Sequence, residues 1–534
     1  MNLTALANNA TLSKNRSYPN DFTLDEEISL MSNSSTDTGL RKGRLGVVGI
    51  VFFVVAAAAP LLGMTGAVPV AMLLGNQAGT PGTYLAVGLV LLVFSVGYAA
   101  MSSKVTNTGA FFAYVGKGLG KHAGVASAFA SLVGYITIQL AIYGFIGGVL
   151  SGQMNASLGI NLPWYAWAII AWVLVTALSL LSVDVGAKVL GVLMIAELLT
   201  LVITSSAVLM NHGANMNLAN SFSPTAIFAG GFGGGAGIAI AFAFASFIGF
   251  EATAIYGEES KDPKRVVPRA TYWAVSIITV LFAFTAFAMA TAMGGNNDGV
   301  AGYVVKASTV GTTVLGNPAG VIFGIADDNL GGTWMSTIMG WLVISSCFAG
   351  ILAFQNAISR YFFALGRGGV LPKSLSKTNK AGAPVNGVIL TSIFAIVVIV
   401  IFAVAKLDGI ANLFTWMSAV TAVAIMFVEI LVSVAVVVYL GKDKAVSIWK
   451  STIAPVVAAV ALAVGTYMLM SRFNLLGSLA PANVDPTTPE GAWQLTGFGW
   501  FLVLLPFIAA AVGLVVSLVN NKNEKSALLE DILS

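Results

Sequence analysis

The chain has 534 residues, of which 57% are hydrophobic and only 9% are charged, and its formal net charge is +4. So little polar sequence excludes a soluble globular domain, and basic residues spread along the whole chain exclude a nucleic-acid-binding protein. The chain has one cysteine, Cys347, which excludes an internal disulfide. Its only histidines are His122 and His212, so we expect no metal site and no cofactor.

The N-terminal residues 1–40 are rich in Asn, Ser and Thr and lack the apolar core of a signal peptide, so they predict a disordered cytoplasmic tail. Twelve later stretches reach the roughly 20 apolar residues that span a bilayer. They predict an all-α polytopic membrane protein with 12 transmembrane helices, divided into a core over 41–440, helices 11 and 12 over 441–520, and a cytoplasmic tail over 521–534. The stretches are 45–74, 82–103, 123–151, 163–183, 186–210, 226–256, 269–293, 334–365, 385–405, 409–440, 451–471 and 497–519.

The basic residues predict the orientation. When loops are assigned alternately to the two sides of the membrane, all but three of the 26 Lys and Arg residues fall on the side of the termini. The exceptions are Lys306, Lys406 and Arg472. Because cytoplasmic loops are enriched in Lys and Arg, we expect a plasma-membrane protein with both termini in the cytoplasm.

Glycine, proline and small residues interrupt the first and sixth predicted helices. Pro removes a backbone donor and Gly lowers the cost of leaving helical geometry, so both helices should free N–H and C=O groups at membrane depth. Two breaks at matched positions indicate a five-plus-five inverted repeat with a substrate site at the midplane, although close helix packing explains either break alone. The residues are Gly63, Met64, Thr65, Gly66 and Ala67 in the first helix, and Phe244, Ala245, Ser246, Phe247, Ile248 and Gly249 in the sixth.

The chemistry of these breaks suits an α-amino acid. Freed N–H groups around Gly63 to Ala67 would bind a carboxylate, and freed carbonyls near Ala245 to Ile248 would accept from an ammonium. A polyamine would instead favour carboxylates at the site, with Glu251 in contact with the substrate.

Three carboxylates lie within predicted spans. Glu197 is near the middle of 186–210 with no basic residue one turn away, so a permanent charge there would be costly and the side chain should often be protonated. This indicates proton coupling, and a buried acid that serves packing is the alternative. Glu251, just past Gly249, would fix the unwound backbone or respond to pH as an inner gate opens. Glu429 is expected to reach the cytoplasmic surface or to pair with a neighbouring helix.

Several stretches resemble the amino acid–polyamine–organocation (APC) superfamily of permeases, which includes bacterial amino acid transporters. The resemblance implies a LeuT-like fold with broken helices 1 and 6, the substrate carboxylate at the first break and its amine at the second. Where many members have Gly-x-Gly in helix 1, this chain has a spacing one residue wider. The stretches are residues 107–115, Phe247–Glu251 with the charged segment 258–268, 356–372, and the break in helix 1.

The same resemblance bears on Glu197, since several relatives have a lysine at the matching place, in the region where sodium-coupled transporters of this fold hold an ion. A glutamate there would carry the transported proton or, less favoured, hold sodium together with Ser345 and Ser346.

These observations predict a secondary active transporter that imports an amino acid by alternating access, coupled to a proton. The alternatives are a polyamine or amine permease and an amino acid exchanger. We expect no enzyme, because no convergent catalytic set is present, and no nutrient sensor, because both tails are short. The expected partners are a small-molecule substrate, a proton and the lipid bilayer; the sequence predicts no oligomeric state.

Overall fold

A computed structural model of the chain describes residues 46–105, 111–181, 187–255, 260–379, 382–477 and 479–520. Within these ranges the chain is largely helical, and an isolated bridge pairs Val310 with Thr313. The predicted tails, 1–40 and 521–534, lie outside the described residues, as do residues 107–110 and 258–259 of the family-like stretches.

The helices of the first half begin with two segments separated at Ala58 and Ala59, and these continue into α5. They are α2 (Val47–Ala57), α3 (Pro60–Leu62), a π-helical turn (Gly63–Ala67), α4 (Val68–Val70), a second π-helical turn (Ala71–Asn76), α5 (Thr80–Ser102), α6 (Phe111–Leu119), α7 (Lys121–Leu158), α8 (Trp164–Leu181), α9 (Ala187–Asn211), α10 (Leu218–Phe222) and α11 (Pro224–Ile227).

The second half repeats an interrupted helix at its start. Its helices are α12 (Ala236–Phe247), α13 (Ala252–Ile255), α14 (Pro263–Ala292), α15 (Asn297–Ser308), α16 (Ala319–Leu330), α17 (Trp334–Arg367), α18 (Val385–Val404), a π-helical turn (Gly409–Phe414), α19 (Thr415–Leu440), α20 (Ala454–Ser471) and α21 (Gly497–Asn520).

Among the described residues, 11 helical runs are long and apolar enough to cross a membrane. Ten of them each overlap one predicted span. The eleventh, Val47–Ser102, overlaps both 45–74 and 82–103, and its 56 residues include non-helical backbone at Ala59, Gly75 and Gln77. The membrane-protein class is thus confirmed, while the division of this run into two spans, and with it the count of twelve, stays a prediction.

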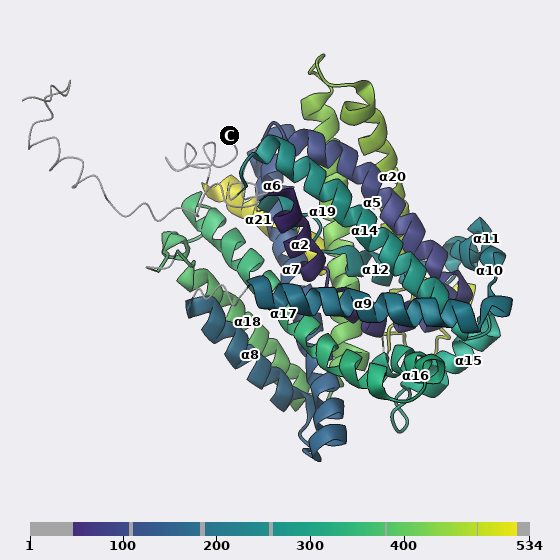
Figure 1. Ribbon diagram of the computed structural model, residues 1–534. Helices are drawn as coiled ribbons and strands as arrows, with labels where there is room; N and C mark the ends of the chain where they lie inside the picture. Colours follow the sequence, from purple (N-terminus) through teal and green to yellow (C-terminus); the bar gives the residue numbers. More distant parts are fainter. Residues whose placement is uncertain are drawn as a thin grey trace, which may run out of the picture. The chain divides into compact units, whose positions relative to one another are not determined.

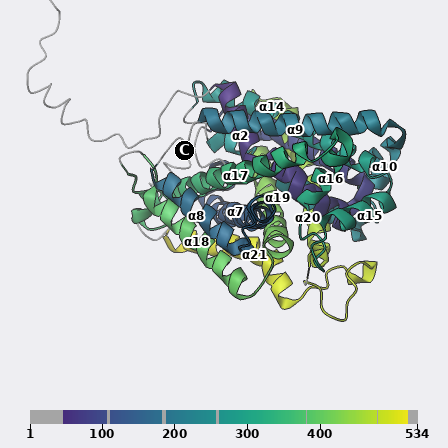
Figure 2. The ribbon, with the colours of Figure 1, turned by 60° about the horizontal axis from the view of Figure 1, so that its bottom comes forward.

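Helix α7 lies at the centre of the packing. It contacts α8, α17, α19 and α21, and Figure 2 shows it amid these helices. Helices α8 and α18 lie side by side, and α5 runs along α14 (Figure 1). The interrupted α12 packs against α5, α19 and α20. The first interrupted helix packs differently: α2 contacts α9, α14 and α17, and α3 contacts α9 and α17. The two interrupted helices are therefore held by different neighbours.

Polar side chains join four helices that flank the site. Gln139 of α7 donates to the side-chain oxygen of Gln355 of α17 at 2.5 Å, and Gln355 donates to Ser392 of α18 at 3.0 Å. The Ser392 hydroxyl also pairs with Thr176 of α8 at 2.9 Å. Inside a membrane the hydrophobic effect does not drive helices together, so interhelical hydrogen bonds of this kind help hold them in contact. They fix α7, α8, α17 and α18 as one polar-linked group.

Candidate functional site

The first helix break lies between α2 and α3. Ala59 adopts the left-handed conformation (φ 45°, ψ 68°), and a new helical segment begins at Pro60. Proline disfavours helical backbone at the residue before it and has no N–H to continue the helix. Among the described residues, the N–H groups of Leu61 and Leu62 find no backbone acceptor. This break therefore presents the N-terminal end of a helical segment, where N–H groups and a partial positive charge point outward.

The position of this break corrects the sequence prediction. Gly63 to Ala67 do not unwind but form a π-helical turn with helical backbone angles at its flanking residues. Thr65 donates its hydroxyl to the carbonyl of Leu61 at 2.7 Å, and Gly66 lies against aromatic rings, so that a Cβ there would be 2.9 Å from both Phe145 and Phe414. Pro60 sets the break, and the wider glycine spacing serves helix packing.

The second break lies between α12 and α13. Helix α12 ends at Phe247, Ile248 is extended (φ −58°, ψ 133°), and Gly249 has φ 114°. The Gly249 N–H donates to a carboxylate oxygen of Glu251 at 2.9 Å. Around the break, the Ile248 N–H donates to the carbonyl of Ala245 at 3.3 Å and the Phe250 N–H to that of Phe247 at 3.3 Å, so the regular i+4 pattern of α12 ends here. This break presents the C-terminal end of a helix, which carries a partial negative charge.

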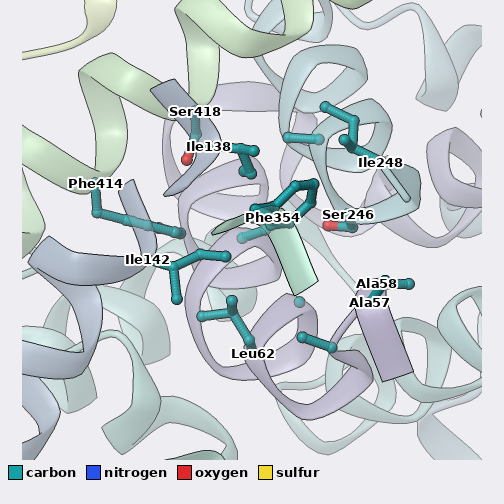
Figure 3. Close-up of a pocket in the computed structure, with 14 residues that line it drawn as sticks. Ala57, Ala58, Leu62, Ile138, Ile142, Ser246, Ile248, Phe354, Phe414 and Ser418 are labelled. Carbon is teal, nitrogen blue, oxygen red and sulfur yellow. The ribbon is translucent and has the colours of Figure 1, made fainter. Parts of the chain in front are cut away.

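A cavity of about 30 Å³ lies between the two breaks. Figure 3 shows the ring of Phe354 at the centre of the lining side chains, with Ser246 and Ile248 on one side and Ile142 and Phe414 on the other. Such a volume holds about two water molecules and no amino acid, so the cavity is nearly closed in this conformation. Its lining residues are Ala57, Ala58, Ala59, Leu62, Gly63, Ala67, Ile138, Ile142, Ala245, Ser246, Ile248, Phe354, Phe414 and Ser418.

Of the eleven predicted substrate residues, the cavity is lined by Gly63, Ala67, Ala245, Ser246 and Ile248. The other six have other surroundings. Met64 is fully buried, Thr65 and Gly66 serve the π-helical turn, and Phe244 faces a separate apolar cavity. Phe247 packs edge-to-face against Phe282 at 5.6 Å between ring centroids, and Gly249 lines a second small cavity.

Sequence reasoning missed most of the apolar wall. Ile138 and Ile142 come from α7, Phe354 from α17, and Phe414 and Ser418 from the π-helical turn before α19 and from α19 itself. Ile138 and Ile142 are four residues apart and so share a helix face, which is a usable signal. Nothing in the spacing says which face of α7 meets the breaks.

Ser246 links the second break to α5. Its hydroxyl donates to the carbonyl of Phe242 at 2.7 Å and pairs with the hydroxyl of Tyr84 at 3.0 Å. The Tyr84 ring packs edge-to-face on Phe282, and a Cβ at Gly63 would lie 3.3 Å from Phe282. Tyr84 and Phe282 thus connect both breaks behind the cavity.

Glu197 of α9 lies behind the first break and is 4% exposed. Its carboxyl group faces the N–H of Leu61 and the hydroxyls of Ser345 and Ser346 on α17. The structure therefore brings together the three residues that the sequence suggested as a coupling site. It also ties them to the first break, because Leu61 is the second residue of the new helical segment.

Glu251 lies below the second break and is fully buried. One carboxylate oxygen accepts from Gly249, and the side chain faces Tyr135 of α7. A second cavity of about 20 Å³ is lined by Glu251, Tyr135 and Arg360, and it shares Ala57 and Phe354 with the first cavity.

Glu429 of α19 was expected to reach the cytoplasmic surface or to pair with a neighbouring helix, and the part of the chain that the structure describes shows neither. It is 0% exposed, and neither carboxyl oxygen has a hydrogen-bond partner among the described residues. Its position on α19 is set by the packing of that helix against α7, which the hydropathy of the sequence does not reveal.

The fold and a cavity bordered by two helix ends are typical of a membrane transporter. Comparisons with known proteins show which family the chain belongs to. The profile of the amino acid permease family matches residues 49–528, so the chain belongs to this family of the APC superfamily.

Two curated relatives illustrate the range of the family. The branched-chain amino acid permease BcaP of Lactococcus lactis subsp. cremoris (strain MG1363) is 29% identical over 369 residues, which are 65% of this chain and 72% of that protein. The aromatic amino acid transport protein AroP of Escherichia coli (strain K12) is 22% identical over 347 residues, 62% of this chain and 70% of that protein.

Among solved structures, a Na+-coupled sialic acid symporter in its substrate-bound outward-open state is similar with a TM-score of 0.50. It is 14% identical, and the match covers 80% of this chain and 90% of that chain. This likeness confirms the LeuT-like transporter fold.

Proposed function

We propose that this protein imports an amino acid with an apolar side chain across the plasma membrane by alternating access, coupled to a proton. The observation that carries the proposal is the cavity at which the N-terminal end of the segment from Pro60 and the C-terminal end of α12 meet. A carboxylate is stabilised at the first end and an ammonium at the second, and a free amino acid has both groups on one carbon.

The wall of the cavity supports the choice of side chain. Ile138, Ile142, Phe354 and Phe414 are apolar, and the polar side chains among the lining residues are Ser246 and Ser418. A hydrophobic pocket favours apolar groups and distinguishes poorly between substrates that differ by one methylene, so we expect several related substrates. The names of BcaP and AroP, one branched-chain and one aromatic permease, agree with this range.

The polyamine alternative is less well supported. A substrate with several ammonium groups needs carboxylates at the cavity, and none of the residues that line the main cavity is Asp or Glu. Glu251 lines only the second cavity, where the Gly249 N–H occupies one of its oxygens.

For coupling, we assign the transported proton to Glu197. A neutral carboxyl group is tolerated at this buried position, whereas a charged one requires donors, and the groups that face it are the Leu61 N–H and the hydroxyls of Ser345 and Ser346. Since Leu61 belongs to the first break, gain or loss of the proton changes the support of that break. One proton moved through 100 mV contributes ~2.3 kcal/mol, or about fiftyfold accumulation. One alternative is sodium held by Glu197, Ser345 and Ser346. The other is exchange without any coupling ion.

The test is uptake by the purified protein in liposomes with an inward proton gradient and no sodium. Labelled leucine, phenylalanine, lysine and putrescine are compared for wild type, Glu197→Gln and, as a matched control, Glu490→Gln in an exposed loop. We expect gradient-driven uptake of leucine or phenylalanine that Glu197→Gln abolishes while substrate binding persists.

Other outcomes overturn defined parts of the proposal. Uptake that needs internal substrate and ignores both the gradient and Glu197 would make the protein an exchanger. Uptake of putrescine alone would replace the amino acid by an amine, and uptake restored only by sodium would assign Glu197, Ser345 and Ser346 to that ion.

A further inference from the structure

A third cavity, larger than the two at the helix breaks, lies away from the substrate site, between α5, α12, α19 and α20. Its volume is about 200 Å³, and it does not share a lining residue with the cavity between the breaks. Its walls come from these four helices and from the end of α11, and they include Ala86, Ile227, Phe244, Met426, Ala461 and Gly465.

The chemistry of its wall excludes a polar occupant. Of the described residues that line it, Thr83 alone has a hydroxyl group, and that hydroxyl is already used. It accepts from the Asn76 side-chain amide at 2.7 Å and donates to the carbonyl of Gly79 at 3.4 Å. A buried water needs two to four polar partners, so water is not retained here. An engineered apolar cavity of about 150 Å³ stays dry and binds benzene, so this one is large enough for an apolar group.

A surface groove lies beside this cavity on the outside of the helices. The groove is lined by Val460, Ala463 and Tyr467 of α20 and by Phe232, and it shares Val464 with the cavity. Val460 is 60% and Phe232 64% exposed, so the groove faces the medium around the helices, which for a membrane span is lipid. An alkyl chain lying in the groove would therefore be next to the cavity, with Val464 in contact with both.

The depth of the groove is marked by aromatic residues. Tyr467 lies four residues before the end of α20, about 6 Å along the helix axis, and its ring is 5.5 Å from that of Trp493. Trp493 stacks on Trp500 at 6.1 Å. Tyr and Trp gather where the membrane meets water, so the groove starts near this interface. The cavity lies beside it at the same height, because 461–465 of α20 line the cavity and 460–467 line the groove.

We propose that the cavity holds one acyl chain of a bilayer phospholipid, whose headgroup lies at the level of Tyr467 and Trp493. An alkyl chain needs no hydrogen bond, is the abundant molecule at this depth, and is anchored at the interface where the groove begins. The acyl chain would contact Phe244 of the protein. The next two residues, Ala245 and Ser246, line the substrate cavity. The site lies outside the transport proposal, so each can fail without the other.

The test uses proteoliposomes that contain a phosphatidylcholine with a diazirine in the middle of one acyl chain. After photolysis, the labelled peptides are identified by mass spectrometry for wild type, for Ala461→Phe, which fills the cavity, and for Val457→Phe, on an exposed face of the same helix that lines neither cavity. We expect label on 461–465 of α20 and 86–90 of α5 in wild type and in Val457→Phe, and a several-fold loss in Ala461→Phe.

Equal labelling in all three proteins, or label confined to the exposed residues of the groove, would overturn the proposal. If Ala461→Phe is not recovered as a monodisperse protein, Ala86→Phe fills the cavity from the opposite wall and gives the same test. Retention of one lipid per chain in native mass spectrometry, lost in the filled variant, is the expected second readout.

Discussion

The two helix breaks that border the substrate cavity are built by different means. At the first, an alanine is held in left-handed backbone before Pro60, and the buried N–H of Leu61 faces the carboxyl group of Glu197 on α9, which Ser345 and Ser346 of α17 also approach. At the second, Gly249 takes φ 114° and its N–H is satisfied by Glu251, two residues later. The first break thus depends on a neighbouring helix. At the second, the turn at Gly249 is encoded locally, while Ser246 also ties that break to Tyr84 of α5.

This difference predicts where each break is vulnerable. A locally encoded break should be sensitive to the residue that adopts the unusual backbone and to its short-range partner. A break held by proline and by neighbouring helices should tolerate a change at the unusual residue itself, provided that its supports remain.

The largest effect is expected from Gly249→Ala. A φ of 114° is nearly restricted to glycine, and a Cβ would lie 3.1 Å from the Cβ of Ala57 at the first break. The strain of ~1–3 kcal/mol should lower uptake by about tenfold or more. The measurement is initial-rate uptake in liposomes, normalised to reconstituted protein. Gly302→Ala, where a Cβ meets open space, is the matched control, and equal uptake in both variants would contradict the local origin of the second break.

A smaller effect is expected from Glu251→Ala. Removal of the carboxylate leaves the buried Gly249 N–H without its acceptor, which costs ~1–3 kcal/mol. Glu251→Gln keeps an acceptor oxygen in the same place and should lose less. Thermal unfolding of the two variants, read beside uptake, checks the order. Equal losses would show that the charge, and not the hydrogen bond to the second break, is what matters.

The contrast between the breaks also separates what could be predicted from the sequence and what could not. Spans follow from runs of apolar residues, a property of the chain in one dimension, and the second break follows from Gly249 beside Glu251. The first break was expected at Gly63 to Ala67 because glycine permits unwinding, but glycine can also stay helical. Proline cannot continue the preceding helix, so Pro60 determines where the break lies.

The walls of the site were beyond prediction for a related reason. Ile138, Ile142 and Phe354 face the breaks because of how α7 and α17 are rotated about their axes, and that rotation depends on packing and on contacts such as Gln139 to Gln355. The meeting of Glu197 with Ser345 and Ser346 came instead from a family resemblance, which carries three-dimensional information that spacing lacks.

A weak effect of opposite sign is expected from Ala59→Gly at the first break. Left-handed backbone costs an alanine ~1–2 kcal/mol that glycine avoids, and the larger entropy of glycine in the unfolded chain offsets part of the gain. The melting temperature should stay unchanged or rise slightly. Ala58→Gly, at a neighbouring residue with helical backbone, should lower it. A fall in Ala59→Gly as large as in Gly249→Ala would mean that the two breaks are built alike.

The smallest effect is expected from Lys104→Met, which touches neither break. The Lys104 ammonium is 3.1 Å from a carboxylate oxygen of Asp443, in the loop before α20, and both side chains are exposed. The N–H of Ala445 and, after it, Lys104 hold the pKa of Asp443 below its usual range, so their stabilisation is present at neutral pH and is lost as acid protonates the carboxylate. Thermal unfolding of wild type and variant should therefore differ slightly at neutral pH and less below about pH 4, where an ordinary Asp titrates. High salt should also shrink the difference, because exposed ion pairs are screened. Uptake should match wild type throughout, and a loss comparable with that of Gly249→Ala would show that transport depends on the loop contacts as much as on the breaks.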